Sequence, residues 1–136
     1  MVLLAKAQQH SARQRRDFQH KEARKWVQAY DVIYQEDLRV ATMVRNHHLA
    51  KSISDAGWST FLSILAFKAA GAGKQVQAVH PAFTSQRCSG LECGVTVQKG
   101  LSIRWHACPD CGTSLHRDHN AALNILRLGQ AHASTA

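Results

Sequence analysis

The sequence predicts a mixed α/β protein in which a strand, a helix and a second strand are followed by a cysteine-rich module and a last helix. Three observations support this prediction. The chain of 136 residues is 45% hydrophobic, as ordinary globular chains are. Its middle part changes from a strand-like composition to apolar residues at helical spacing. All four cysteines fall between residues 88 and 111, in two close pairs.

The first 30 residues predict a basic helix. Phenylalanine, tryptophan, valine and tyrosine at near-helical spacing form an imperfect apolar stripe: Phe18, Trp26, Val27 and Tyr30. Seven basic residues stand against Asp17 and Glu22 in this segment. We expect the apolar stripe to pack on a core and the basic face to be solvated, with phosphate contacts as an additional role.

A strand is predicted over residues 31–40, where β-branched and aromatic residues gather. Residues 41–54 favour a loop or an irregular helix. Apolar residues at i, i+3, i+4, i+7 and i+11 predict a helix over 58–70, with Ser54 or Asp55 as its cap.

Gly71 and Gly73 are expected to end this helix, and residues 75–80 favour a second strand that closes before Pro81. A strand–helix–strand crossover is right-handed and joins parallel strands. We therefore expect the two strands to run in the same direction.

Two cysteine pairs define a metal-binding module. Cys88 and Cys93 form a C-x4-C pair, and Cys108 and Cys111 form a C-x-x-C pair. Two such pairs suit the tetrahedral thiolate coordination that zinc prefers. Four ligands leave no open coordination position, so the spacing predicts a structural zinc ion that stabilises the module and performs no hydrolysis.

Glycines give these pairs room to turn: Gly90 and Gly94 accompany the wider pair, and Gly112 follows the tighter one. His106 and His116 are competing ligands, and either could replace a cysteine that points away. Between the pairs, residues 95–97 and 101–105 flank Gln98-Lys-Gly100, a plausible hairpin turn.

A last helix is predicted over residues 118–128, ended by Gly129, with a frayed tail after it. The chain is accordingly divided into five segments: 1–30, 31–83, 84–114, 115–129 and 130–136.

The net charge of +8 favours a polyanionic partner, of which nucleic acid is the usual one, and a solvated basic surface is the alternative. No apolar run approaches the ~20 residues that cross a bilayer. The short apolar start does not resemble a signal peptide, and unsecreted cysteine pairs bind metals rather than form disulfides. We expect a cytoplasmic, nucleoid-associated protein that contacts DNA through basic residues: Arg13, Arg16, Lys21, Lys51, Arg87, Arg104 and Arg117.

Glu36 and Asp118 are the candidate catalytic residues. Glu36 lies on the predicted first strand, and Asp118 begins the last helix. Carboxylates that converge on Mg²⁺ can cleave phosphodiesters. The simpler interpretations are a strand-end charge for Glu36 and a helix-capping charge for Asp118. Asp37 faces the other side of the strand and cannot share the site.

Five stretches occur in order along the chain: residues 17–21, 33–40, 49–58, 84–88 and 117–126. Together they resemble the C-terminal part of TnpB (OrfB) proteins, which are insertion-sequence-encoded, RNA-guided DNA endonucleases long described as transposases. These proteins are related to type V CRISPR effector nucleases. The resemblance covers roughly residues 10–128.

The resemblance implies a partial RNase H-like (RuvC-type) fold with an inserted four-cysteine zinc ribbon. It also implies that Glu36 and Asp118 match the second and third of the family's three catalytic acids, which bind Mg²⁺ once the site is complete. Upstream of Glu36, no acid lies in an apolar strand, so the family's first Asp has no counterpart. The family further implies a guide RNA and an N-terminal half chain as partners.

The preferred interpretation is therefore a C-terminal fragment of a TnpB-like nuclease that binds DNA and zinc and cannot cleave alone. A second interpretation is a stand-alone zinc-binding module that binds nucleic acid or regulates. A third is a purely structural zinc protein, which would leave the basic charge unexplained.

Overall fold

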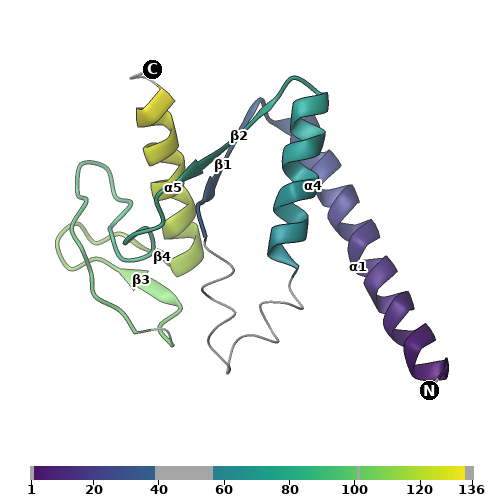
Figure 1. Cartoon of the computed structure of the whole chain (residues 1–136). Coiled ribbons are helices and arrows are strands. Elements are labelled where there is room, and N and C mark those ends of the chain that lie inside the picture. Colours follow the sequence, from purple (N-terminus) through teal and green to yellow (C-terminus); the bar gives the residue numbers. More distant parts are fainter. Residues whose placement is uncertain (1, 39–56, 101, 134–136) are drawn as a thin grey trace. The chain divides into compact units, whose positions relative to one another are not determined.

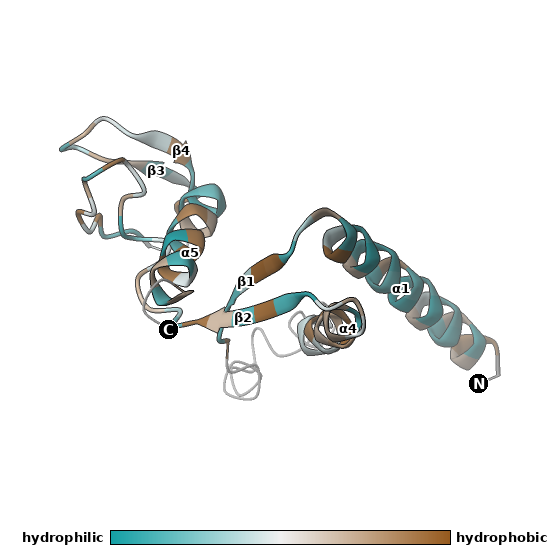
Figure 2. Cartoon of the chain, turned by 90° about the horizontal axis from the view of Figure 1, so that it is seen from above, coloured by the Kyte–Doolittle hydropathy of each residue, from teal (hydrophilic) through white to brown (hydrophobic). Residues whose placement is uncertain are grey.

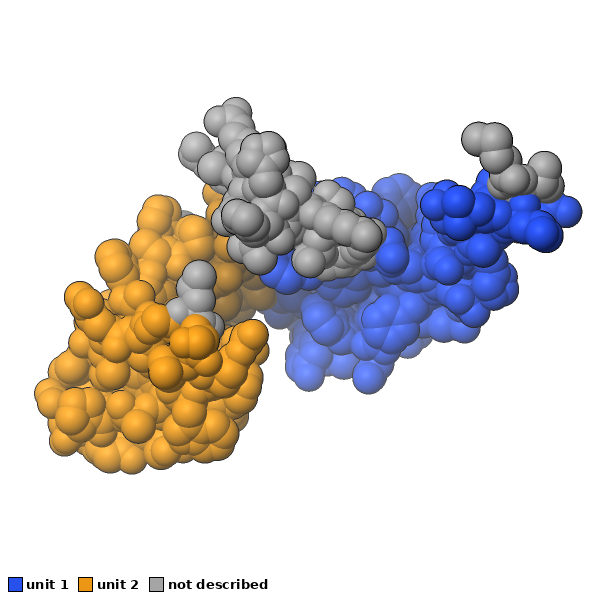
Figure 3. Space-filling view, turned by 90° about the horizontal axis from the view of Figure 1, so that it is seen from below, with its two compact units in different colours: residues 1–33, 39–76 blue, residues 34–38, 77–136 orange. Residues whose placement is uncertain are grey.

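The computed structural model describes residues 2–38, 57–100 and 102–133, which fall into two compact units (Figure 1). Unit 1 comprises residues 1–33 and 39–76, and unit 2 comprises residues 34–38 and 77–136 (Figure 3). Strands β1 (Val32–Glu36) and β2 (Gln75–Val79) both pass from unit 1 into unit 2. Lys51, Ser54 and Asp55 lie outside the described residues, as does the loop predicted over 41–54.

Unit 1 is built on two helices, α1 (Val2–Ala29) and α4 (Trp58–Gly71). The helix predicted over the first 30 residues is confirmed, and it is hydrophilic over most of its surface (Figure 2). The two helices pack through four buried side chains: Ala23, Val27, Leu65 and Ala69. In the described part of the chain, no helix is both long and apolar enough to span a membrane.

The apolar stripe predicted for the first helix is wrong for two of its residues. Phe18 and Tyr30 are 63% and 60% exposed, respectively, whereas Gln19, Ala23 and Val27 are buried. The buried residues are spaced four apart, so they share one helix face. Ala23 and Val27 of this face pack against α4, and Trp26 of the predicted stripe contacts Phe61 of α4 edge-on, with ring centroids 5.2 Å apart.

The N-cap predicted for α4 is also wrong. The capping position is Gly57, whose φ is 62°, and no side chain makes a capping hydrogen bond. Gln19 Nε2 of α1 donates to the Gly57 carbonyl at 3.0 Å instead. The end of α4 agrees with the prediction: the helix stops at Gly71, and Gly73 has a φ of 67°.

Strands β1 and β2 are hydrogen-bonded neighbours and run in the same direction, as predicted. The Gln75 amide donates to the Asp31 carbonyl before the strands, and the Asp37 amide donates to the Val79 carbonyl after them. Residue numbers thus increase together along both strands. β1 covers only part of the strand predicted over 31–40, and residues 39 and 40 lie outside the described residues.

Unit 2 contains two short antiparallel pairings, and they correct the predicted hairpin. Residues 95–97 do not pair with the described residues 102–105, because Thr96 pairs with Arg87. Strand β3 (Trp105–Ala107) pairs with β4 (Ser114–His116). Each pairing therefore encloses one cysteine pair, and the turn at each cysteine pair closes the hairpin in place of the stretch 98–100.

The last helix, α5 (Arg117–Ala133), is longer than predicted. Gly129 does not end it but lies inside it, buried. A Cβ atom at this position would lie 2.0 Å from Cδ1 of Tyr34, so glycine is required by the close approach of the ring and not by a turn. Residues 130–133, predicted as tail, belong to the helix.

Candidate metal centre and neighbouring carboxylates

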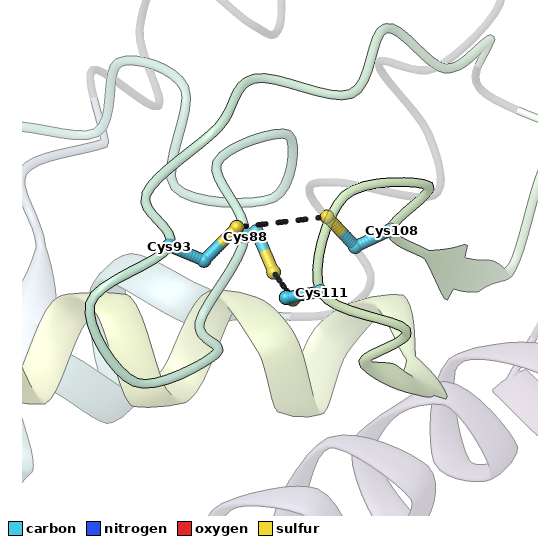
Figure 4. A group of neighbouring side chains, drawn as sticks. All are labelled: Cys88, Cys93, Cys108 and Cys111. Atoms are coloured by element: carbon cyan, nitrogen blue, oxygen red, sulfur yellow. Dashed lines mark hydrogen bonds between the residues drawn. The ribbon is translucent and has the colours of Figure 1, made fainter.

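The four cysteine sulfur atoms converge on one point in unit 2 (Figure 4). All four lie within 4.8 Å of one another. Cys88 Sγ is 3.5 Å from Cys111 Sγ, and Cys93 Sγ is 3.7 Å from Cys108 Sγ. Metal–sulfur bonds of about 2.3 Å in a tetrahedron require sulfur atoms about 3.8 Å apart. The cluster therefore fits a tetrahedral metal ion between two cysteine pairs, as the spacing predicted.

Glycines shape the turns of both pairs. A Cβ atom on Gly90 would lie 2.9 Å from Cys111 Sγ, and the Gly90 amide donates to Cys88 Sγ at 3.3 Å. The wider pair needs two residues with positive φ, Glu92 at 58° and Gly94 at 65°. In the tighter pair Gly112, with a φ of 71°, donates its amide hydrogen to the Cys108 carbonyl.

The electrostatics of the cluster differ from thiol to thiol. The hydrogen bond between Cys111 Sγ and the Thr113 hydroxyl lowers the pKa of Cys111 to about 6. Burial raises the pKa of the Cys88 thiol. A cysteine binds a metal as the thiolate, so Cys111 is ready to bind one at neutral pH. The Cys88 thiol is expected to lose its proton only when the metal binds.

Neither competing histidine joins the cluster in the described part of the chain. His106 is fully buried, and its Nδ1 contacts Lys99 Nζ. Burial and the charge of Lys99 both lower the pKa of His106. His116 Nδ1 lies 3.6 Å from Asp118 Oδ2 and accepts a hydrogen bond from the Asp118 amide.

Two buried asparagines of α5 hold the loop that carries Cys88. Asn120 Nδ2 donates to the Arg87 carbonyl at 2.7 Å, and its Oδ1 accepts the Ser89 amide hydrogen at 3.0 Å. Asn124 Nδ2 donates to the carbonyls of Thr84 and Arg87 at 2.8 and 2.7 Å. The loop over residues 84–89 is thus fixed to the last helix by side-chain amides rather than by apolar packing.

The same loop also holds Glu36. The buried Thr84 hydroxyl donates to Glu36 Oε1 at 2.5 Å. Glu36 is half-buried at the end of β1, and Asp37, which follows the strand, is exposed. The segment from Thr84 to Cys88 therefore connects the cysteine cluster with this carboxylate.

Asp118 lies in the first turn of α5, where its side chain is 76% exposed. Asp118 and Gly129 are about three helical turns apart, so they share one face of the helix. Gly129 approaches Tyr34, and Tyr34 shares a strand face with Glu36. The contact of α5 with β1 that the structure shows is that of Gly129, and Asp118 lies about 16 Å from Gly129 along the helix axis.

Sequence reasoning did not find Thr84, Asn120 and Asn124. A signal for the asparagines exists, because Asn disfavours helix interiors unless its amide has a specific partner, and two of them here stand four apart on one helix face. Thr84 carries no such signal, since its role depends on a strand nearly fifty residues earlier.

The predicted nucleic-acid contacts are distributed over both units. Arg13, Arg16 and Lys21 are exposed on α1, where Lys21 forms an ion pair with Asp17 at 2.6 Å. Arg87 and Arg104 are exposed in unit 2. The Arg117 guanidinium donates to the Gly100 carbonyl at 3.1 Å and to the Ser85 hydroxyl at 3.4 Å, so it supports the module internally.

The chain is similar to one family model, to two curated relatives and to a solved structure. The family model "Cas12f1-like, TNB domain" matches residues 58–125. The chain is 38% identical over 116 residues to a Streptomyces pristinaespiralis protein named as an RNA-guided DNA endonuclease. It is 36% identical over 133 residues to the Escherichia coli K12 protein named as the RNA-guided DNA endonuclease InsQ.

The alignments cover 85% and 86% of this chain but only 28% and 33% of these two relatives. The chain thus spans about a third of the length of the curated relatives it matches. Among solved structures, a complex of Cas12f1 with sgRNA and target DNA matches with a TM-score of 0.63 at 21% identity. This match covers 91% of this chain and 35% of the Cas12f1 chain, and it shows a shared fold.

Proposed function

The chain belongs to the Cas12f1-like TNB domain family, and we propose on this premise that it forms the C-terminal part of a TnpB-like, RNA-guided DNA endonuclease. In this proposal the strands and α5 belong to a RuvC-type, RNase H-like fold, and residues 84–114 form its zinc ribbon. One observation carries the proposal: a single loop, residues 84–89, contacts Glu36 through Thr84 and enters the cysteine cluster at Cys88.

Zinc is the metal that we propose for the cysteine cluster. Thiolates in a tetrahedron suit zinc, and the four positions are filled by protein ligands. The ion would therefore stabilise the module and take no part in cleavage. Its effect on activity would be indirect, because it would hold Cys88 and with it the loop that positions Glu36.

Glu36 and Asp118 are proposed to bind catalytic Mg²⁺, which in phosphodiester cleavage activates the attacking water and stabilises the leaving oxygen. The hydroxyl of Thr84 orients the Glu36 carboxylate by donating to Oε1 and leaves its second oxygen available for a cation. Asp118 is exposed at the start of α5, where solvent and a cation can reach it.

A polypeptide of these 136 residues is proposed to bind DNA without cutting it. The chain offers two carboxylates where the family uses three to bind the metal ions. Losing one member of a catalytic set commonly lowers the rate by ~10⁴. A strand from an N-terminal half chain would supply the third acid, and a guide RNA would determine the DNA sequence that is targeted. A cytoplasmic, nucleoid-associated location follows from this role.

A chimera tests the catalytic assignment. Residues 1–136 would replace the matching third of the Escherichia coli relative, and DNA cleavage with Mg²⁺ would be followed by gel electrophoresis. We expect Glu36→Gln and Asp118→Asn to lower cleavage by ~10⁴. Asp37→Asn is the matched control, because it removes the adjacent exposed carboxylate, and it should leave cleavage unchanged. A chimera that cuts equally well with Glu36→Gln would contradict the assignment.

The alternative is a stand-alone zinc-binding module that binds nucleic acid or regulates. The complete cysteine set and the net charge of +8 favour it. Both proposals predict DNA binding that weakens with salt. Only the nuclease proposal predicts that Glu36→Gln abolishes cleavage in the chimera.

A further inference from the structure

Unit 2 contains a cavity of about 580 Å³ beside the cysteine cluster. Its volume lies within the range of small-ligand sites, about 300–1,000 Å³. The wall includes an aromatic ring, Phe83, two guanidinium groups, those of Arg87 and Arg127, and the carboxylate of Glu92. Arg87 is one of the predicted nucleic-acid contacts, whereas the sequence indicates no role for the other three residues.

Phe83 is the feature of this wall that the fold does not explain. Its φ is 62°, a left-handed conformation that is unfavourable for a bulky residue, and the residue is 67% exposed. Its carbonyl accepts the amide hydrogens of Gln86 and Arg87, so the conformation makes a turn. Glycine would make that turn without strain, and the ring buries little surface, so neither the turn nor packing accounts for an aromatic side chain here.

The charges around the ring favour an anionic ligand. Arg87 and Arg127 are both exposed, and they outnumber the single carboxylate, Glu92. Arg127 Nη1 lies 3.5 Å from the Gly90 carbonyl, and the Arg87 guanidinium lies beside Gly94. Both cations are therefore held over the knuckle of the wider cysteine pair, at the edge of the cavity.

We propose that this cavity binds one unstacked nucleobase of single-stranded DNA, with the Phe83 ring as the stacking surface and the Arg87 and Arg127 guanidinium groups on the flanking phosphates. Aromatic rings bind successive bases of single strands by stacking, and basic side chains follow the backbone. The Glu92 carboxylate can accept a hydrogen bond from the base, either from an exocyclic amino group or, in thymine, from the N3 hydrogen. A base within a duplex is stacked and paired, so it cannot enter.

The position of the cavity links it to the carboxylate. Thr84 lines the cavity, and its hydroxyl donates to Glu36 Oε1. A nucleotide held against Phe83 would therefore bring its own backbone next to Glu36. This consequence rests on the proposed nuclease function, whereas binding of a single strand in the cavity does not require cleavage.

Phe83→Gly is the decisive variant, because it removes the ring and relieves the strained turn together. Fluorescence anisotropy of the full chain, loaded with zinc, would be measured with labelled short oligothymidylate and with a duplex of equal length. We expect Phe83→Gly to weaken oligothymidylate binding by about fivefold or more and to leave duplex binding and thermal stability undiminished. Arg127→Gln should reduce the salt dependence of single-strand binding by about 0.7 in the log–log slope.

Phe67→Ala is the matched control, since Phe67 is 83% exposed on α4 and does not line the cavity. It should leave binding of both DNAs unchanged. Unchanged oligothymidylate binding in Phe83→Gly would overturn the inference while leaving the proposed DNA binding intact. An equal loss for single strand and duplex would also overturn it. If the wild-type chain bound neither DNA, the proposed DNA binding would fail, and the inference with it.

Discussion

Unit 1 and unit 2 are each stabilised by a different kind of interaction. The buried side chains of unit 1 are mainly apolar and join two helices: Ala23, Val27, Leu65 and Ala69. Unit 2 buries mainly polar side chains and two of the cysteines: Thr84, Ser89, His106, Asn120, Asn124, Cys88 and Cys108. Apolar burial stabilises by about 25 cal/mol per Å², whereas a satisfied hydrogen bond contributes only about 1 kcal/mol net. We therefore expect unit 2 to depend on a metal ion at the cysteine cluster for its stability, and unit 1 to be stable without one.

Loss of one metal ligand should have the largest difference in effect on the stability of the two units. We expect Cys108→Ser to unfold unit 2, because a structural zinc ion contributes on the order of 10 kcal/mol to a small module. Hydrogen exchange should show lost protection over residues 102–133. The packed parts of α1 and α4, around Ala23 and Leu65, should stay protected. Added zinc should not restore the variant, whereas it should restore a wild-type chain that was stripped by a chelator. Simultaneous loss of protection in both units would contradict the comparison.

Leu65→Ala should destabilise unit 1 and leave unit 2 unchanged. Leu65 is 1% exposed in the apolar cluster, and truncation of a buried leucine costs about 2–5 kcal/mol. Hydrogen exchange of α1 and α4 should accelerate, while metal content, measured by a colorimetric zinc assay, should stay unchanged. Phe67→Ala removes a larger but exposed side chain of the same helix and should change neither quantity.

Two glycine substitutions sharpen the comparison further. Gly129→Ala would place a Cβ atom 2.0 Å from the Tyr34 ring, and overpacking of this kind costs about 1–3 kcal/mol. Gly71→Ala meets nothing within 4 Å and should be neutral or slightly stabilising. Chemical denaturation monitored by circular dichroism would measure both. Equal destabilisation by the two substitutions would show that the close approach of α5 to β1 is not real.

The smallest expected effect is that of a surface ion pair in unit 1. Lys74 lowers the pKa of Asp31 from 3.8 through a hydrogen bond and its charge. A lowered carboxyl pKa stabilises the fold above the unfolded-state pKa, and this contribution is lost as the pH falls through the folded-state value. Because Asp31 is fully exposed, Asp31→Asn should lower the denaturation midpoint only slightly at pH 7 and not at all at about pH 2. A difference that persisted in acid would contradict the assignment.

The cluster of four cysteines could be predicted from the sequence because the spacing of a cysteine pair is a local property. The same holds for the helix ends at Gly73 and for the turn at Gly112, where a residue type reports a backbone conformation. Both histidine alternatives could be discarded only with the structure, since their distance from the sulfur atoms depends on the pairing of β3 with β4.

The remaining features depend on contacts between distant segments. Gly129 resembled a helix end in the sequence, and only the approach of Tyr34 explains its place inside α5. Likewise, Thr84 gains its role from Glu36 on a separate strand. The predicted stripe on α1 was wrong at Phe18 and Tyr30, whereas Val27 is buried and Trp26 contacts Phe61 of α4. Amphipathic spacing identifies a helix more reliably than it identifies which of two weakly apolar faces is buried.

Paramagnetic line broadening by Mn²⁺, in place of Mg²⁺, tests most directly whether Glu36 and Asp118 serve one cation site. In the zinc-loaded chain, NMR resonances of both residues should broaden at the same Mn²⁺ concentration, and Glu36→Gln should abolish the broadening at Asp118. Broadening at Asp118 that persists undiminished in Glu36→Gln would show that the two carboxylates bind cations separately and would contradict the account.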